Sequence, residues 1–328
     1  DGATDINEQP SKGGSEGAKR LGGLMNTALL GYGATEVLRD AHVYRGVDDP
    51  DTWKAIRSGR PIPHPPKVPF IYNKYLNTLR GAGIRVSETS RSVGIAAMTD
   101  KDVDALSPIE VDSAETIDDK TGAPIPGGLF DYSKFGGPTQ MGWGVVTLDE
   151  PIPNPVMEDS VRSILGVTEN EMREIMAGKR PFRGVLGPKA LPAALKGVSL
   201  DDEELDAKQK IASGRSSVRN DALKKLRAIR GLRNANLSPN DMLVSKIPVI
   251  PPAYRPAVRM GDMTIVSDSN YLYKDLLGAR SAFRANREIL PDEDLVDERL
   301  AVYDAVRAIQ GLGDPIHQET RDKGVKGF

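Results

Sequence analysis

Residues 247–256, with the sequence IPVIPPAYRP, constrain the fold more than any other part of the chain. Four of these ten residues are proline, and each proline fixes φ near about −65° and removes a backbone donor. The stretch is therefore predicted to be neither a buried strand nor a helix interior, but a rigid, extended loop tipped by Arg255 and Arg259. Cations on a stiff backbone suit a polyanion, whereas a proline-rich surface connector is the simpler interpretation.

This stretch and residues 267–273 resemble the lid of the largest subunit, β′, of multisubunit DNA-dependent RNA polymerases. The family pattern is leucine-proline-valine-leucine-proline-proline-x-leucine-arginine-proline, then a short hairpin, then serine-aspartate-x-asparagine-x-leucine-tyrosine. The matching residues keep this order and spacing: Pro248, Val249, Ile250, Pro251, Pro252, Arg255, Pro256, Ser267, Asp268, Asn270, Leu272 and Tyr273. The resemblance implies a lid that separates RNA from template DNA, and the positive charge of Arg255 and Arg259 predicts that they neutralise phosphates there.

The composition offers little apolar material for independent cores. The 328 residues include 33 glycines and 24 prolines, and hydrophobic residues make up 39% of the chain. This length allows two or more domains, so part of the chain is expected to rest on other chains. The 44 basic and 46 acidic residues give a net charge of −2, so contacts with nucleic acid must be sought locally.

Cysteine is absent, which excludes disulfides and cysteine-based zinc sites. The histidines His42, His64 and His317 fit no ligand spacing, and a structural role is predicted for each. No apolar run approaches the ~18 residues of a membrane span, and there is no secretory signal. A cytoplasmic protein without a membrane partner is therefore expected.

The N-terminal region resembles the C-terminal end of the polymerase β subunit. The family's glutamine-proline-x-glycine-glycine, arginine-x-glycine and alanine-leucine-x-x-tyrosine-glycine-alanine patterns recur here, and residues 66–84 resemble the last β helix. The matching residues are Gln9, Pro10, Gly13, Gly14, Lys19, Arg20, Gly22, Ala28, Leu29, Tyr32, Gly33 and Ala34. This segment is expected to form the clamp base, where Lys19 and Arg20 neutralise phosphates.

The next segment resembles the β′ zipper. Glu115, Thr116 and Ile117 match a glutamate-threonine-isoleucine pattern, and residues 127–136 match a glycine-leucine-phenylalanine pattern. In the family a four-cysteine zinc module follows, whereas here residues 137–140 replace it and lead into a strand that begins near Gly142. The joining of β-like and β′-like sequence without this module is typical of a divergent polymerase, such as a bacteriophage enzyme.

Two helical regions flank the lid-like stretch. Apolar spacing predicts a helix over 24–39, which Gly31 and Gly33 weaken, and a helical pair over 159–178. The acidic residues at 201–204 are predicted to begin a helix, because carboxylates complement the dipole there. The basic segment 208–233 is either a solvated helix face or a clamp surface that faces nucleic acid. Apolar spacing also predicts antiparallel helices over 268–288 and 293–312, with Ile289 among the residues that face the interior. This hairpin resembles the β′ clamp helices, which dock σ factors, but Gly278, Ala279 and Ser281 depart from the family pattern and argue against an ordinary σ factor. An acidic surface of a σ-like partner is expected to meet Arg280, Arg284 and Arg287, and Glu298, which follows the family pattern of the second helix, is also assigned to partner binding.

The predicted fold class is α+β: an irregular, multi-module polymerase clamp region with an antiparallel helical hairpin and little independent core. The last residues, KGVKGF, resemble the approach to a switch, and Lys323 and Lys326 are added to the nucleic-acid-binding set. The modules are 1–97 (β-like clamp base), 98–158 (β′-like with zipper), 159–246 (helical clamp segment), 247–267 (lid), 268–312 (clamp helices) and 313–328 (rudder and switch approach).

The resemblance implies a component of DNA-directed RNA polymerase that holds the template and the RNA–DNA hybrid. Nucleotide addition in this family needs Mg²⁺ bound by a loop of aspartates, which would lie beyond Phe328, so the chain alone is predicted to be inactive and to hold no cofactor. The expected partners are the rest of β and β′, α-like subunits, template DNA, nascent RNA and a σ-like factor. The alternative is a non-catalytic, polymerase-mimicking protein that binds specificity factors or DNA.

Overall fold

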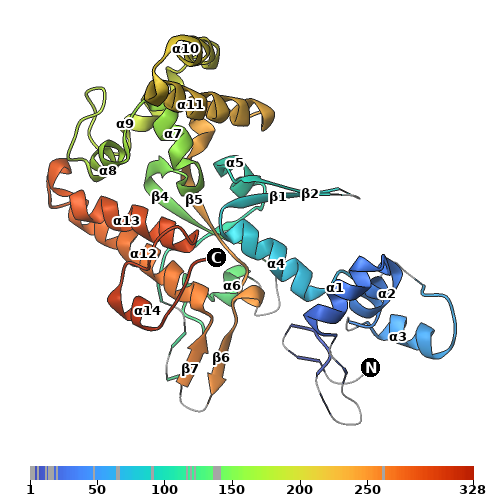
Figure 1. Ribbon diagram of the computed structural model, residues 1–328. Coiled ribbons are helices and arrows are strands. Elements are labelled where there is room, and N and C mark those ends of the chain that lie inside the picture. Colours follow the sequence, from blue (N-terminus) through green and yellow to red (C-terminus); the bar gives the residue numbers. More distant parts are fainter. Residues whose placement is uncertain are drawn as a thin grey trace. The chain divides into compact units, whose positions relative to one another are not determined.

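The computed structural model of the protein describes residues 4–328 except 6, 12, 14–17, 20, 47–48, 64–66, 90–91, 116, 119, 122, 136–141 and 261–262, and it gives only the backbone at 258–260, 263 and 264 (Figure 1). The chain forms two compact units, residues 1–77 and residues 78–328. Among the described helices, none is long and apolar enough to cross a membrane. The finer division into six modules stays a prediction.

The first unit is helical and has a sparse core. It contains α1 (Gly23–Gly31), α2 (Thr35–Arg39), the π-helical turn η1 (Asp40–Tyr44), α3 (Pro50–Arg57) and the start of α4 (Phe70–Gly81). Gly33, with φ of 69°, separates α1 from α2, so the helix predicted over 24–39 is split in two. No residue of α1 or α2 is buried. This unit therefore has little apolar core, as the composition predicts.

The second unit contains small sheets. The central one has the order β3 (Ile109–Glu110), β4 (Gly144–Pro153) and β5 (Leu243–Val249), in which β4 pairs parallel to β3 and antiparallel to β5. Two antiparallel pairs complete the strands: β1 (Ile84–Glu88) with β2 (Val93–Ala97), and β6 (Ala257–Met260) with β7 (Met263–Val266). Before β1, α4 ends close to residue 250, where a Cβ on Gly81 would lie 2.4 Å from the Cγ2 of Ile250.

Strand β5 corrects the first prediction from the proline-rich stretch. Residues 247–249 lie in this strand and are buried, with Pro248 opposite Val145 of β4. The strand accepts a proline because β5 is at the edge of its sheet, where one side of the backbone has no ladder partner to lose. The carbonyl of Pro248 instead accepts a hydrogen bond from the Tyr273 hydroxyl at 3.3 Å.

A carboxylate binds the backbone of β5 where the register between β4 and β5 shifts. The pairing breaks between Thr147 and Ile152, and the Asp100 carboxylate accepts from the backbone N–H groups of Ser245 and Lys246 at 3.0 and 3.1 Å. Asp100 begins α5 (Asp100–Asp104), and Met98 and Val103 pack with Val145. Residues 98–104 are therefore packed onto the sheet.

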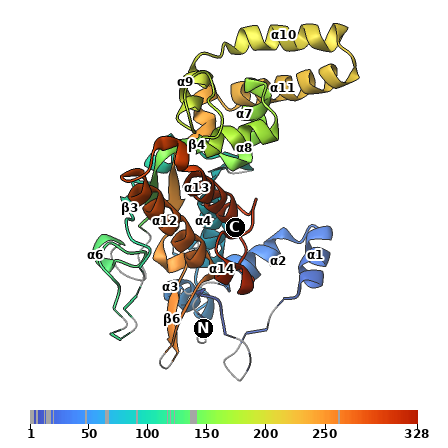
Figure 2. The same ribbon diagram turned by 90° about the vertical axis from the view of Figure 1, so that its left-hand side faces the viewer.

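Helices surround this sheet. The helical pair predicted over 159–178 is confirmed as α7 (Glu158–Leu165) and α8 (Glu169–Ala177). The acidic residues at 201–204 lie, as predicted, in the first turns of a helix, α10 (Leu200–Ser213). Helices α10 and α11 (Ser216–Asn234) pack against each other and form the top of the second unit in Figure 2. The remaining elements are α6 (Tyr132–Phe135), η2 (Pro155–Met157), α9 (Ala190–Lys196), α10 (Leu200–Ser213), α11 (Ser216–Asn234), η3 (Pro239–Met242), η4 (Pro252–Tyr254), η5 (Asp292–Asp294) and α14 (Gln318–Asp322).

The predicted helical hairpin is present. Helices α12 (Asp268–Arg287) and α13 (Val296–Ile309) pack along each other. Phe328 contacts both Tyr273, near the start of α12, and Ile309, at the end of α13, so these two helix ends lie side by side. The interior is apolar, with Leu272, Leu276, Leu295, Val306 and Ile309 at most 1% exposed. Ile289 was predicted to face this interior and does not, because it lies beyond the end of α12 and is 80% exposed.

Candidate nucleic-acid interface

The lid-like stretch contains a projecting β-hairpin. Strands β6 and β7 pair from Ala257 opposite Val266 to Met260 opposite Met263. Figures 1 and 2 both show this hairpin extending away from the central sheet and the helices of its unit. The predicted extended loop thus consists of a buried strand end, the short helix η4 and a hairpin that leaves the body of the unit.

The base of the hairpin is closed by hydrogen bonds that involve Asn270. The backbone N–H of Ser267 donates to the carbonyl of Pro256 at 3.1 Å, directly below the last strand pair. The fully buried Asn270 amide donates to the carbonyls of Ser267 and Arg255, at 3.1 and 3.2 Å. One side chain of α12 therefore holds both ends of the hairpin.

Arg255 is the centre of this base, and its burial corrects the prediction that it contacts nucleic acid. The guanidinium is 0% exposed and donates to the Ile250 carbonyl at 2.7 Å, the Asn270 side-chain oxygen at 2.9 Å and the Leu129 carbonyl at 2.5 Å. It also lies 4.8 Å from the centre of the Phe130 ring. With its donors directed into the protein, Arg255 joins three segments and does not face a phosphate.

The Arg255 site is an unusual environment for a cation. Among the described residues, no carboxylate lies within ion-pair distance of its guanidinium, and burial lowers the pKa of Arg255 to about 10. A pKa of about 10 still leaves the group charged at neutral pH, where carbonyl oxygens and the faces of Phe130, Phe135 and Tyr273 surround it. Burial also raises the pKa of Tyr273 to about 12, so its hydroxyl stays protonated.

The loop that presents Leu129 and Phe130 to Arg255 is organised by Asp131. Its buried carboxylate accepts from the backbone N–H of Gly127 at 2.7 Å and from the backbone and hydroxyl of Ser133 at 3.0 and 2.6 Å. These hydrogen bonds hold the pKa of Asp131 below its usual range, because they stabilise the charged form.

We expect Asp131→Asn to lower the free energy of unfolding by about 1–2 kcal/mol at neutral pH, because an amide keeps only one acceptor oxygen. Since folding lowers the pKa of this carboxyl, its contribution is present above its unfolded pKa and is lost as the pH falls through the folded pKa. The difference between parent and variant, measured by urea unfolding, should therefore shrink from about pH 6 to about pH 3. An unchanged difference over this range would contradict the assignment.

The other predicted nucleic-acid contacts lie on the surface or outside the described residues. Arg20 and the side chain of Arg259 are outside them, and Lys19 is exposed. Lys323 pairs with Glu319 at 2.7 Å and lies 4.3 Å from the centre of the Tyr271 ring, whereas Lys326 is 80% exposed and 3.6 Å from an acid, Asp314. Contacts of these cations with nucleic acid stay predictions.

The residues predicted to meet a σ-like partner differ in exposure. Arg280 is 1% exposed and donates to Glu110 at 2.8 Å and to the carbonyl of Val111 at 3.0 Å, so its predicted partner role is corrected to a link between α12 and the sheet. Arg284 is half-exposed and binds Asp149 at 2.9 Å, Arg287 is exposed, and Glu298 accepts from Asn286 at 2.5 Å. A partner role for these three stays a prediction.

Segments of the chain are similar in sequence to subunits of known DNA-directed RNA polymerases. A 154-residue segment is 28% identical to the β′-β″ subunit of DNA-directed RNA polymerase from Cyanidioschyzon merolae and covers 46% of this chain. A 130-residue segment is 32% identical to the β′ subunit of Acidothermus cellulolyticus, over 39% of this chain. The chain is related to multisubunit RNA polymerases.

The similarity to RNA polymerase subunits covers only part of this chain and part of each relative. The γ subunit of Synechococcus elongatus is 30% identical over 141 residues, 42% of this chain. The matches span 9%, 10% and 23% of the lengths of these three polymerase subunits, so the chain covers less than a quarter of each relative. No protein-family model matches the chain. The similarity of residues 1–97 to β and the loss of the zinc module stay predictions, and residues 137–140 are outside the described residues.

Proposed function

We propose that this chain is part of a multisubunit DNA-directed RNA polymerase, in which the β6–β7 hairpin is a lid that separates nascent RNA from template DNA. The observation that carries the proposal is a projecting hairpin whose base is fixed by the buried Arg255 and Asn270, in a chain related to β′ subunits. A hairpin that parts two strands must keep its direction under load. The Arg255 network supplies that stiffness.

The rest of the chain would frame the lid. The α12–α13 hairpin would dock a specificity factor, residues 111–136 would act as the zipper, and the first unit would belong to the base of the clamp. The bond-making Mg²⁺ would be held by aspartates outside these 328 residues. In this proposal the chain's own side chains position nucleic acid and perform no step of nucleotide addition.

The proposal is tested by shortening the lid in an assembled polymerase. Replacing residues 259–264 with two glycines removes most of the hairpin and keeps Arg255, Asn270 and the Ser267–Pro256 hydrogen bond. We expect longer RNA–DNA hybrids behind the active centre, measured as RNA that RNase H cleaves upstream of its normal limit. The rate of nucleotide addition should change little, because the metal loop is elsewhere.

A matched control shortens another antiparallel pair of the same unit. Replacing residues 88–93 of the β1–β2 hairpin with two glycines is the same six-to-two exchange, and it should leave the hybrid at its parental length. A normal hybrid in the lid variant would overturn the lid assignment. A chain that never co-purifies with other polymerase chains would overturn the subunit assignment and favour the polymerase-mimicking alternative.

A further inference from the structure

Helix α11 carries arginines that its own fold does not use. Arg219, Arg227 and Arg230 are all exposed. At 100° per residue they lie within an arc of about 80°, which we call the arginine face. Asp221, the one acidic residue in the sequence of α11, lies about 200° from Arg219 and outside this arc. The arc therefore carries three arginines and no acidic residue of α11, and it also includes the half-buried Leu223.

Other basic residues of α11 are neutralised by α10. Lys225 pairs with Glu203 at 2.5 Å, and Arg233 pairs with Asp201 and Glu204. These pairs join the two helices on the side where Ala222, Leu226 and Ile229 are buried. Among the described residues, Arg219 and Arg227 have no ion-pair partner, and Arg230 is near Glu204 only at longer range. The arginine face thus remains available to an external anion.

The dimensions of the face fit a long polyanion. Arg219 and Arg230 are 11 positions apart, which is about 16 Å along a helix at 1.5 Å per residue. Duplex DNA carries one charge per about 1.7 Å of its axis, so a straight helix of this length faces several phosphates at once. A small anion would need converging donors instead of a row of them.

The composition of this helical hairpin distinguishes a duplex from a single strand. Binding of single strands relies on aromatic side chains on which bases stack. The sequence from residue 196 to residue 246, which contains α10 and α11, has no phenylalanine, tyrosine, tryptophan or histidine. The face offers guanidinium groups, which suit phosphate oxygens, and nothing for a base to stack on.

We propose that the arginine face of α11 binds the phosphate backbone of duplex DNA without sequence preference. That the ligand is a duplex backbone follows from the arginine face itself. That the duplex is DNA and not RNA rests on the proposed polymerase function. The binding strength should depend steeply on salt, because each neutralised phosphate releases counterions.

The test uses the full 328-residue chain and a fluorescent 30-base-pair DNA of arbitrary sequence. The variant is Arg219→Gln with Arg227→Gln and Arg230→Gln, all at exposed positions, so folding, checked by circular dichroism, should be unchanged. We expect affinity to fall at least about tenfold near 0.1 M salt, and the slope of log K against log salt to decrease by about 2–3.

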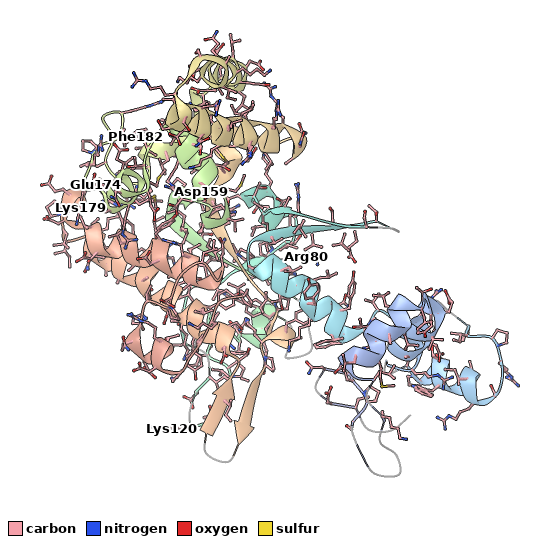
Figure 3. All side chains as sticks on the ribbon, in the orientation of Figure 1. Arg80, Lys120, Asp159, Glu174, Lys179 and Phe182 are labelled. Carbon is pink, nitrogen blue, oxygen red and sulfur yellow. The ribbon has the colours of Figure 1, made fainter. Side chains whose placement is uncertain are left out.

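Two controls make the result specific. Arg→Lys at the same three positions keeps the charge and should keep the salt slope. Glutamine at Lys179, which Figure 3 labels beyond α8, and at Lys196 and Arg321 removes equal charge from exposed cations elsewhere and should cost little affinity.

Each outcome decides for or against the arginine face. Loss of duplex DNA binding in the glutamine variant alone supports it. Equal loss in the Lys179, Lys196 and Arg321 variant would overturn it, as would an unchanged slope in the glutamine variant or tighter parental binding to single-stranded DNA or to duplex RNA. None of these results depends on the lid experiment, so the face can fail while the polymerase assignment stands.

Discussion

Replacing Arg255 with alanine is expected to lower the free energy of unfolding of residues 78–328 by about 3–5 kcal/mol. The change leaves the Ile250 carbonyl, the Leu129 carbonyl and the Asn270 oxygen buried without their donor, and each such group costs about 1–3 kcal/mol. It also empties the space among three aromatic rings. The loss of the arginine's own desolvation cost offsets part of this sum.

The measurement is urea unfolding followed by the fluorescence of Trp143, which is 9% exposed, in a Trp53→Phe background. Arg255→Lys should fall between parent and alanine variant, because an ammonium keeps the charge but cannot donate to three separate segments. Arg227→Ala, at an exposed arginine, should change stability by less than about 0.5 kcal/mol. A cost below about 1 kcal/mol for Arg255→Ala would refute the anchoring role.

The parts of the fold that were predictable from the sequence are those set by neighbours along the chain. The apolar rhythm of 268–312 gave the α12–α13 hairpin because helical faces repeat every few residues. The run of acids at 201–204 marked the first turns of α10 because carboxylates complement a helix N-terminus. Gly33 was recognised as weakening a helix and proved to divide it.

The errors concern contacts between residues far apart in sequence. Arg255 binds Leu129 across 126 positions, and Arg280 binds Glu110 across 170. Nothing local to either arginine reveals these partners, so both were taken for surface cations. Pro248 was wrongly excluded from a buried strand. An edge strand tolerates a proline, but which strand lies at an edge depends on pairing between distant segments, which the local sequence does not show.

The hairpin of the candidate site was therefore predicted at the right place in the chain, and the arginine at its base was misread. The sequence indicated a hairpin between residues 256 and 267, and β6 and β7 form one there. It assigned Arg255 to the ligand, whereas the arginine supports the hairpin from below. Asn270 was part of the matched pattern without a role; the structure gives it one as the partner of Arg255.

A second large effect is expected at Arg299, which links α13 to β4. Its side chain is 1% exposed and binds both oxygens of Glu150, at 2.9 and 3.2 Å, and one oxygen of Asp292 at 2.6 Å. Glu150 is itself buried. Arg299→Met should cost about 3–5 kcal/mol, because it leaves the Glu150 carboxylate buried without a counter-charge.

The neighbouring pair provides a control on the same strand. Arg284 binds both oxygens of Asp149 through its Nε, at 2.9 and 3.0 Å, but its side chain is 47% exposed. Arg284→Met should therefore cost less than about 1 kcal/mol, since solvent screens an exposed pair. The contrast between these adjacent carboxylates compares an exposed ion pair with a buried one on the same strand.

The double variant Arg299→Met with Glu150→Leu identifies the cause of the cost. Removing both charges of a buried pair leaves no stranded carboxylate, so we expect the double variant to recover most of the stability that Arg299→Met loses. Urea unfolding of the parent, both single variants and the double variant gives the coupling energy directly. A double variant as unstable as Arg299→Met would show instead that the arginine acts mainly by packing against Phe283, whose ring centre lies 5.9 Å from the guanidinium carbon.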